Sequence, residues 1–333
     1  MSDKTYKAYV VDETEKNVFE RNIKDKSIND LPEGDVLVKV HYSSLNYKDA
    51  LSATGNRGVT RNFPHTPGVD AAGIIEESRD ERFSIGQQVI VHGYDLGCNT
   101  WGGFGEYIRV PAEWVVTLPK GLSLRESMIY GTAGYTAAYS VLKLEQFGVM
   151  PGMGEILVTG ATGGVGSVAV AILAKSGHQV VASTGKTDEA QFLLNLGAQE
   201  VISREDSKDE SGRPLLKSRW AGAVDTVGGE ILATAIKSTN PRGVVTCCGN
   251  VASAELPINV YPFILRGVSL VGIDSQDTPM DLRQQIWDRI STDWKLDQLE
   301  QLTTEITIQE LDSNIELILQ GKQKGRVLIN LTK

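Results

Sequence analysis

The stretch EILVTGATGGVGSVAVAILAK, residues 155–175, decides the fold of this chain. Residues 156–159 are apolar or β-branched and predict a short buried strand, whereas residues 168–174 repeat apolar side chains at helical spacing. Glycines at 160, 163, 164 and 166 lie between them and predict a turn. A strand, a glycine turn and a helix leave free backbone N–H groups at the helix N-terminus, where a pyrophosphate can bind.

This turn matches most of the dinucleotide fingerprint G-x-G-x-x-G. Ala161 takes the place of the first glycine, and Gly163 and Gly166 hold the second and third places. Glycine turns also occur for purely steric reasons. The rest of the chain has to decide between these two interpretations.

Composition predicts two globular domains, because 333 residues exceed the usual size of one. A net charge of −9 argues against a general nucleic-acid surface. No apolar run is long enough to cross a bilayer, and residues 1–16 lack the apolar core of a signal peptide. The cysteines are three, Cys98, Cys247 and Cys248, and an odd number is not a disulfide framework. We therefore expect a cytoplasmic protein.

The first part of the chain predicts many short strands, at residues 6–11, 36–43, 74–77, 88–91, 107–111 and 115–118. This spacing is typical of a partly closed β-barrel. A helical pattern follows over residues 123–147, with Ser123 as its N-cap and Glu126 as the partner in a capping box. The junction of two domains is expected near this point.

From residue 155 onward strands and helices alternate. The apolar strands lie at residues 156–159, 179–183, 200–202, 222–225, 243–248 and 268–273. Six such strands joined by helices predict a doubly wound parallel sheet, a Rossmann domain with the glycine turn after its first strand. We assign residues 124–296 to this domain and residues 1–123 with 297–333 to the β-rich one.

The tip of the second Rossmann strand indicates which dinucleotide binds. NAD-binding domains place a carboxylate there, but this chain has Ser183, Thr184, Gly185 and Lys186, with no acid before Asp188. These groups suit a 2′-phosphate, so NADPH is predicted. Lys186 as a solvated lysine is the alternative. Arg204, after the third strand, is a second candidate cation or else a surface arginine.

The order of the two domains resembles the medium-chain dehydrogenase/reductase superfamily. Within it, several segments are similar to the zinc-free quinone oxidoreductase branch, and most of all to the acrylyl-CoA reductase group (the YhdH/YhfP type). These segments are SSLNYKDAL at 43–51, FPHTPGVDAAG at 63–73, WGG at 101–103, GTAG at 131–134, AVDTVG at 223–228 and PFILR at 262–266. The resemblance implies a GroES-like β-rich catalytic domain beside the Rossmann domain.

The residues at the metal position predict that no zinc binds. A catalytic zinc needs Cys or His ligands. Where zinc members of the superfamily carry their first cysteine this chain has Asn46, and where they carry Gly-His-Glu it has Gly68, Val69 and Asp70. Without that Lewis acid, hydride addition to an activated C=C bond remains feasible, since the carbonyl of the substrate delocalises the charge.

The resemblance also implies site residues. Tyr47 is expected to contact the nicotinamide end of the cofactor and the substrate, or to donate a proton, and Asn46 to orient the enone carbonyl. A hydrogen-bonded structural corner is the alternative for both. Asp70 is expected to be structural. The cofactor is expected to contact Thr162, Gly163, Gly164, Val165, Gly166, Asn250, Ile264 and Ser275.

The resemblance favours a short 2-enoyl-CoA such as acryloyl-CoA as substrate, with quinone reduction and a non-catalytic NADPH-binding sensor as alternatives. The phosphates of CoA need cations. Candidates are Arg57, Arg61, Arg266, Lys324 and Arg326, although surface arginines are common. A homodimer through the last Rossmann strand is expected, since superfamily members usually dimerise so and pairing covers its edge.

Overall fold

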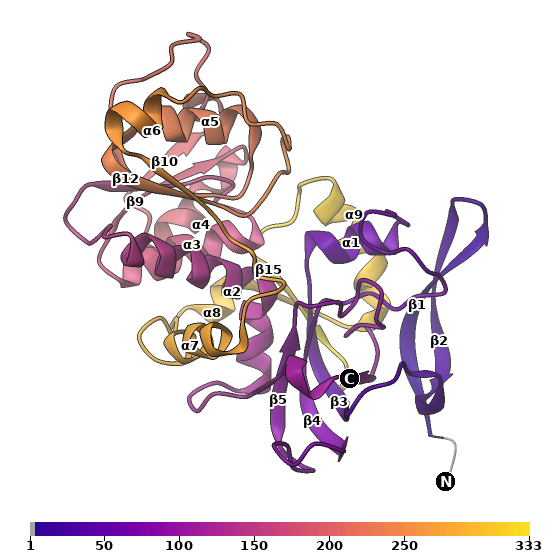
Figure 1. Ribbon diagram of the computed structural model, residues 1–333. Helices are drawn as coiled ribbons and strands as arrows, with labels where there is room; N and C mark the ends of the chain where they lie inside the picture. The colour runs from indigo at the N-terminus through magenta and orange to yellow at the C-terminus, as the bar shows by residue number, and fades with distance from the viewer. Residues whose placement is uncertain (1–3) are drawn as a thin grey trace. The chain divides into compact units, whose positions relative to one another are not determined.

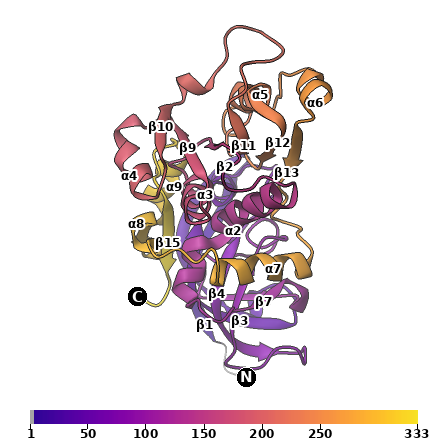
Figure 2. The ribbon, with the colours of Figure 1, turned by 90° about the vertical axis from the view of Figure 1, so that its left-hand side faces the viewer.

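A computed structural model describes residues 4–333 of the chain. It divides into two compact units (Figures 1 and 2). Unit 1 comprises Met1–Thr132, Gln276–Ser291 and Leu299–Lys333, and unit 2 comprises Ala133–Ser275 and Thr292–Gln298. These ranges differ from the predicted domains mainly at Gln276–Ser291, which packs in unit 1.

Unit 1 is rich in β-structure. Its strands are β1 (Thr5–Glu15), β2 (Val18–Ser27), β3 (Val36–Leu45), β4 (Asp70–Ser78), β5 (Gln88–His92), β6 (Tyr107–Val110), β7 (Val115–Thr117), β14 (Thr303–Ile306) and β15 (Arg326–Asn330). Its helices are α1 (Tyr47–Ala53), α7 (Met280–Ser291), α8 (Leu299–Leu302) and α9 (Leu311–Leu319), with short 3-10 turns between elements.

The seven-stranded sheet of unit 1 has the order β14-β15-β3-β4-β5-β7, with β6 also paired to β3. The tail strand β15 pairs antiparallel with β3, and so the end of the chain completes the sheet begun near its start. Val36, Val38 and Val40 alternate along β3 into a core that includes Ile329 of the tail. Burying this shared apolar face holds the two ends of the chain together.

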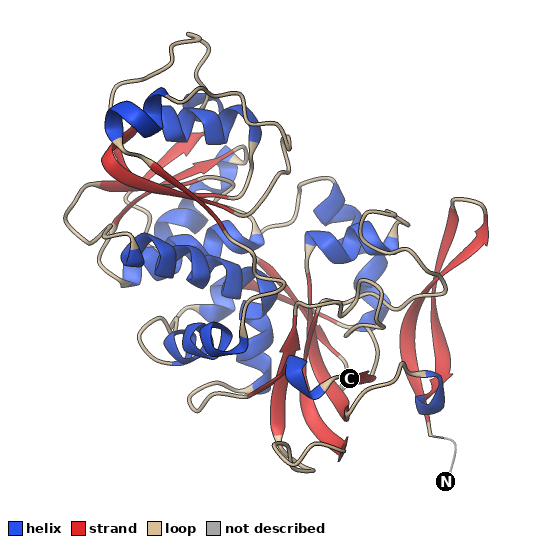
Figure 3. Cartoon of the chain, viewed as in Figure 1, coloured by secondary structure: helices blue, strands red, loops and turns tan. Residues whose placement is uncertain are grey.

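Strand β2 and helix α1 of unit 1 were not predicted from the sequence patterns. Strand β2 forms a hairpin with β1 (Figure 3), and most of its residues are exposed or half-buried, so no apolar alternation marks it. Helix α1 is only seven residues long and buries small side chains such as Ala50 and Ala53. One or two turns of helix are too short to show the helical periodicity of apolar residues.

Helix α7 joins unit 1 through buried polar contacts. Arg283 donates to the backbone carbonyl of His92 at 2.7 Å, and Trp287 Nε1 donates to His92 Nε2 at 2.8 Å. Burial and the nearby guanidinium hold the pKa of His92 well below its usual range, so the ring stays neutral and can accept from Trp287. The helical period alone does not reveal such contacts.

Unit 2 is the predicted doubly wound domain. Its parallel sheet contains β8 (Glu155–Val158), β9 (Gln179–Thr184), β10 (Glu200–Ser203), β11 (Trp220–Asp225), β12 (Thr239–Cys247) and β13 (Ser269–Gly272). The strand order is β10-β9-β8-β11-β12-β13, and in Figure 2 the labels β10, β9, β11 and β12 run from left to right in this order. Helices α3 (Gly164–Lys175) and α4 (Ala190–Asn195) connect strands on one side of β8, and α5 (Gly229–Lys237) and α6 (Tyr261–Arg266) connect strands on the other. The six parallel strands are confirmed.

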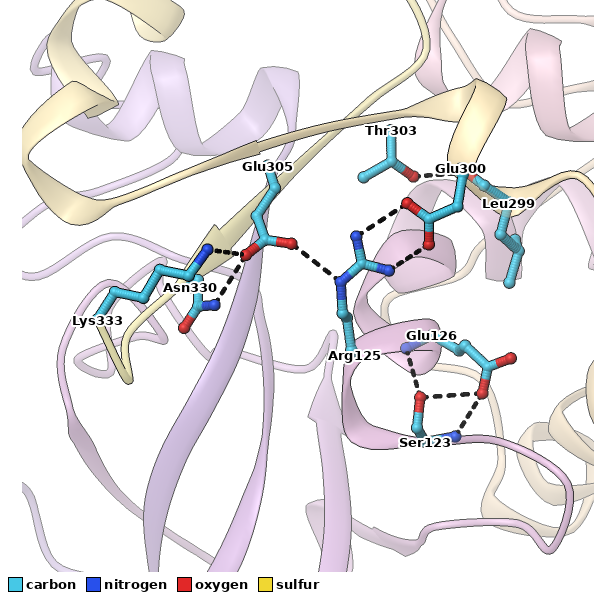
Figure 4. Close-up of polar contacts among 9 residues, drawn as sticks. All are labelled: Ser123, Arg125, Glu126, Leu299, Glu300, Thr303, Glu305, Asn330 and Lys333. Atoms are coloured by element: carbon cyan, nitrogen blue, oxygen red, sulfur yellow. Dashed lines mark hydrogen bonds and ion pairs between the residues drawn. The ribbon is translucent and has the colours of Figure 1, made fainter.

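Helix α2 (Leu124–Gln146) contains the boundary between the units and begins as the sequence predicts. Ser123 and Glu126 form a reciprocal cap, in which Ser123 N donates to Glu126 Oε2 at 2.7 Å and Glu126 N donates to Ser123 Oγ at 3.1 Å. Figure 4 shows this cap beside Arg125, whose guanidinium pairs with Glu300 and Glu305. These ion pairs connect the first turn of α2 to the C-terminal segment. Among residues 4–333, no helix has both the length and the apolar character that a membrane span requires.

Candidate functional site

The glycine turn of unit 2 links β8 to α3 and is shaped by steric contact. Gly160 has φ +59°, and a Cβ there would lie 2.3 Å from Thr226 Oγ1. A Cβ on Gly166 would lie 2.4 Å from the carbonyl oxygen of Gly160, so the helix can approach the turn only with glycine. Gly163 is the N-cap and has no side chain to cap the helix. The first amides of α3 are therefore available to an anion.

A buried acid from the neighbouring strand supports this turn. Asp225, at the end of β11, accepts from Thr159 Oγ1 at 2.7 Å and from Gly228 N at 2.8 Å. Thr226 adds a bond from its hydroxyl to the carbonyl of Thr159 at 2.9 Å. Burial raises the pKa of Asp225. Sequence reasoning assigned no role to Asp225 or Thr159, although both stand at carboxyl ends of parallel strands, where ligands of such sheets bind.

The predicted 2′-phosphate residues come together at the tip of β9. Ser183 and Thr184 are buried, and their hydroxyls pair with those of Ser207 at 2.6 Å and Thr162 at 3.1 Å. The guanidinium of Arg204 lies across Gly185, where a Cβ would be 2.6 Å from Arg204 Nη2.

Lys186 follows in the same turn, and its backbone N donates to Thr184 Oγ1 at 3.0 Å. Because the hydroxyls of Ser183 and Thr184 already pair within the protein, the exposed guanidinium of Arg204 is the group best placed to meet a phosphate.

The other predicted cofactor residues of unit 2 are spread over three segments. Asn250 is exposed just after β12, and Ser275 is half-buried just after β13. Both therefore lie at the carboxyl ends of their strands, as the glycine turn does. Ile264 lies on α6 and is 67% exposed. Val165 is half-buried in the first turn of α3.

The predicted catalytic pair of unit 1, Asn46 and Tyr47, adjoins a buried polar network. Asn46 is the N-cap of α1, and its Nδ2 donates to Asp70 Oδ2 at 2.7 Å and to Asp49 Oδ2 at 3.2 Å. Its Oδ1 accepts from Arg326 Nη1 at 3.3 Å. Since both ends of the amide are engaged, the contacts favour the structural alternative for Asn46. Asp70 is likewise anchored in the protein.

Helix α2 is broken at Gly131 to receive the carboxylate of Asp70. Gly131 has φ +50° and ψ −159°, and a Cβ there would lie 2.4 Å from Ser44 Oγ and 2.6 Å from Asp70 Oδ2. The break frees the backbone N–H of Thr132, which donates to Asp70 at 2.9 Å while Thr132 Oγ1 donates at 2.6 Å. Asp70 thus caps the second half of α2.

Two buried carboxylates share one buried guanidinium in this network. Arg326 is 2% exposed, and it donates to the carbonyl of Ile129 at 2.9 Å and to Ser44 Oγ at 2.8 Å. Burial lowers the pKa of Arg326. Burial and the charge of Asp70 raise the pKa of Asp49 to about 7. A proton on Asp49 would balance the charge of two acids and one base.

Tyr47 is the exposed member of the predicted pair. It is the first residue of α1, and it is 39% exposed although Asn46 and Asp49 on either side of it are buried. Lys48 beside it donates to Gln276 Oε1. The backbone of Tyr47 is therefore fixed at the start of α1, while its side chain remains exposed.

The five candidate substrate cations differ in their surroundings. Arg326 is buried in the network, and Arg266 donates to the carbonyls of Leu216, Lys237 and Thr239. Both guanidinium groups therefore bind the protein itself. Arg57 pairs with Glu13, whereas Arg61 and Lys324 are exposed.

No group of three or more His, Cys, Asp and Glu side chains that could hold a metal lies within residues 4–333. Asn46 and Val69 stand where, by resemblance, zinc members of the superfamily carry metal ligands. That zinc does not bind stays a prediction from these residues. Sequence reasoning missed Asp49 and Thr132, although the N-x-x-D spacing of Asn46 and Asp49 is that of a capping box and was a usable signal.

Comparisons with known proteins match this architecture. The family described as "Alcohol dehydrogenase GroES-like domain" matches residues 32–120, and "Zinc-binding dehydrogenase" matches residues 164–292. The chain is 48% identical over 322 residues to "Putative quinone oxidoreductase YhfP" of Bacillus subtilis (strain 168), covering 96% of this chain and 98% of that protein. It is 42% identical over 327 residues to "Acrylyl-CoA reductase AcuI" of Ruegeria pomeroyi, covering 98% and 99%.

Solved structures give the same result. The yhdH oxidoreductase from Salmonella enterica in complex with NADP has a TM-score of 0.95 at 43% identity, covering 97% of this chain and 99% of that one. Bacillus subtilis protein yhfP with NAD bound has a TM-score of 0.96 at 46% identity, covering 98% and 99%. These bound dinucleotides belong to the relatives and differ between them.

The raised pKa of Asp49 predicts a pH-dependent stability. Asp49 binds a proton more tightly in the folded state than in the unfolded state. Its contribution to stability is therefore largest at low pH and is lost as pH rises from the unfolded pKa of about 4 to about 7. Relative to Asp49→Asn, the wild-type protein should lose about 1 kcal/mol per pH unit across that range. Urea unfolding at pH 5, 6, 7 and 8 measures this. Parallel curves for the two proteins would contradict it.

Proposed function

Because the chain belongs to the medium-chain dehydrogenase/reductase superfamily, in the group of quinone oxidoreductases and acrylyl-CoA reductases, we propose that it is a zinc-independent, NADPH-dependent reductase of activated C=C bonds. Its substrate is a short 2-enoyl-CoA such as acryloyl-CoA. The observation that supports this most is the accessible phenol of Tyr47, held at the start of α1 on a buried network without metal ligands. The three thiols Cys98, Cys247 and Cys248 are free, which suits the cytoplasm.

The residues divide the work of the reaction. NADPH, when bound, supplies the hydride. The first amides of α3 and the glycine turn, including Thr162, Gly163 and Gly164, bind its pyrophosphate. Tyr47 hydrogen-bonds the reacting end of the cofactor or donates a proton to the substrate carbon next to the carbonyl. Asn46 acts through Tyr47 and is a positioning residue, since its amide is engaged by Asp70 and Arg326.

Quinone reduction is the second candidate, because a relative that is 48% identical carries a quinone oxidoreductase name. Steady-state turnover of NADPH with acryloyl-CoA, a simple enone, 1,4-benzoquinone and phenanthrenequinone separates the two. We expect the highest kcat/KM with acryloyl-CoA, with one propionyl-CoA formed per NADPH and no oxygen uptake. A higher kcat/KM with a quinone would reject the enoyl-CoA proposal. Saturable NADPH binding without any turnover would favour a non-catalytic sensor.

The same assay tests the role of Tyr47. Tyr47→Phe removes only the hydroxyl, and loss of a proton donor should lower kcat with acryloyl-CoA by roughly 100-fold or more. The matched control is Tyr42→Phe, at a half-buried tyrosine on β3 of unit 1. An unchanged kcat in Tyr47→Phe would remove the proton-donor role.

The preference for NADPH rests on the tip of β9. Arg204 and Lys186 supply positive charge there, and Ser183, Thr184 and Gly185 bring no carboxylate. A 2′-phosphate gains charge-assisted hydrogen bonds from a guanidinium. Arg204→Ser should lower kcat/KM for NADPH by roughly 10- to 100-fold and change that for NADH much less. Arg213→Ser, at an exposed arginine of the same unit, is the control. Equal losses with both dinucleotides would contradict the assignment.

The exposed edge of β13 supports a homodimer. β13 is the last strand of its sheet, and α6 before it exposes Tyr261, Ile264 and Leu265. Unpaired strand edges and apolar patches are commonly covered by a partner. Light scattering should give a mass near twice 36.2 kDa, and Leu265→Asp should lower it toward that of one chain. A single-chain mass at all concentrations would reject the dimer.

A further inference from the structure

The hairpin β1–β2 is attached to the loop that leaves helix α1. Val11 on β1 and His65 at the end of this loop exchange two backbone hydrogen bonds, of 2.8 and 2.9 Å. The ring of Phe19 on β2 lies on Gly55 at the start of the loop, where a Cβ would be 2.0 Å from the ring. The loop of residues 54–64, which we call the arginine loop, is thus held at both ends by the hairpin.

Arg57 fixes the middle of the arginine loop to the hairpin. Its Nη2 pairs with Glu13 Oε1 at 2.5 Å, and its guanidinium lies 5.5 Å from the ring of Phe19 and 5.2 Å from that of Phe63. Glu13 Oε1 also accepts from Asn17 N at 3.0 Å, so one carboxylate joins the hairpin turn to the loop. Its bond with Arg57 lowers the pKa of Glu13. The charge of Arg57 is thereby neutralised.

Arg61 has a fixed backbone and a free cation. Arg57 Nη1 donates to the carbonyl of Arg61 at 2.7 Å, and Arg61 N donates to Asn99 Oδ1 at 3.2 Å. Asn99 is itself bound to Asp95 at 3.0 Å. In the described part of the chain no acid pairs with the Arg61 side chain, which is exposed. Arg57 therefore fixes the backbone from which an exposed guanidinium extends, available to an anion.

The place of this cation suits a phosphate that is remote from the reacting bond. The arginine loop begins where α1 ends, and Tyr47 is the first residue of α1. Seven helical residues span about 10 Å. In a CoA thioester the pantetheine arm separates the phosphates from the acyl group by more than the length of α1. A residue that binds a phosphate must therefore lie well away from Tyr47. Simple quinones and enones carry no such group.

We propose that Arg61 binds a phosphate of the CoA moiety and that Arg57, held by Glu13 and the hairpin, is the positioning residue for it. The inference rests on the proposed enoyl-CoA substrate and adds the element that selects CoA thioesters over uncharged acceptors. Figure 1 shows the hairpin beside α9, to which Arg21 also fixes it through Asp312 at 3.1 Å and Glu316 at 3.1 Å. The hairpin is therefore a rigid support for the loop.

Steady-state kinetics with two thioesters test this assignment. Arg61→Ala should raise KM for acryloyl-CoA roughly tenfold, the loss expected for one exposed charge-assisted contact, with kcat changed less than about twofold. KM for acryloyl-N-acetylcysteamine, which has no phosphate, should not change. The control is Arg79→Ala, at an exposed arginine just beyond the far end of β4 from Asp70. An unchanged KM for acryloyl-CoA, or equal losses with both thioesters, would overturn the proposal.

A double-mutant cycle tests the role of Arg57. Arg57→Ala should raise KM for acryloyl-CoA by roughly three- to tenfold, and Arg57→Ala/Arg61→Ala should be no worse than Arg61→Ala, because both act on one contact. Additive losses would show that Arg57 does not act through Arg61. Unchanged KM for the phosphate-free thioester in Arg57→Ala excludes general damage to the fold.

Calorimetric binding of propionyl-CoA separates failure of this inference from failure of the proposed function. If the wild-type protein binds propionyl-CoA but does not reduce acryloyl-CoA, the proposed reaction is wrong. Weaker binding by Arg61→Ala, roughly tenfold, would then still support the phosphate contact. Equal binding by both proteins would overturn it, and so would absence of binding by the wild-type protein.

Discussion

The carboxylate of Asp70 is the constraint on which unit 1 depends. It is fully buried, and an unpaired charge in such a place would cost several kcal/mol. Ser44, Asn46 and Thr132 supply its donors, and Arg326 supplies the positive charge nearby. Ser44 and Asn46 lie at the junction of β3 and α1, whereas Thr132 lies far along the chain. Satisfying one carboxylate therefore fixes the end of β3, the start of α1 and the break in α2.

This network explains how a buried acid is accommodated at this place by the protein's own donors. By resemblance, Asp70 falls where zinc members of the superfamily place an acid behind the metal ligands. Here the amide of Asn46 donates to Asp70 and to Asp49, and the guanidinium of Arg326 provides the cation. The acids therefore hold the backbone before Tyr47. Tyr47 itself remains exposed, whereas Asn46 and Asp49 are buried.

Sequence patterns predicted those elements that are marked by a regular spacing of apolar residues or by glycines at turns. The six strands of unit 2 and the Ser123 cap follow from local residues, and the structure has them. The network around Asp70 did not follow, because Ser44, Asn46, Asp70, Thr132 and Arg326 are brought together only by sheet pairing. Strand β2 was missed for a related reason. Its side chains Phe19 and Arg21 contact residues far away in the sequence, and no local pattern reveals such contacts.

The two phosphate sites that we propose use opposite physical means. In unit 2 the glycine turn presents backbone amides, and its shape is fixed by sterics at Gly160 and Gly166 and by the buried carboxylate of Asp225. Any side chain there would clash, so the site tolerates little change. In unit 1 a single side chain, Arg61, presents the charge, and its position depends on surface contacts of Arg57. A surface cation can be replaced without disturbing a core. Substrate selection is therefore the property of this protein that substitutions can alter most easily while the dinucleotide site and the fold persist.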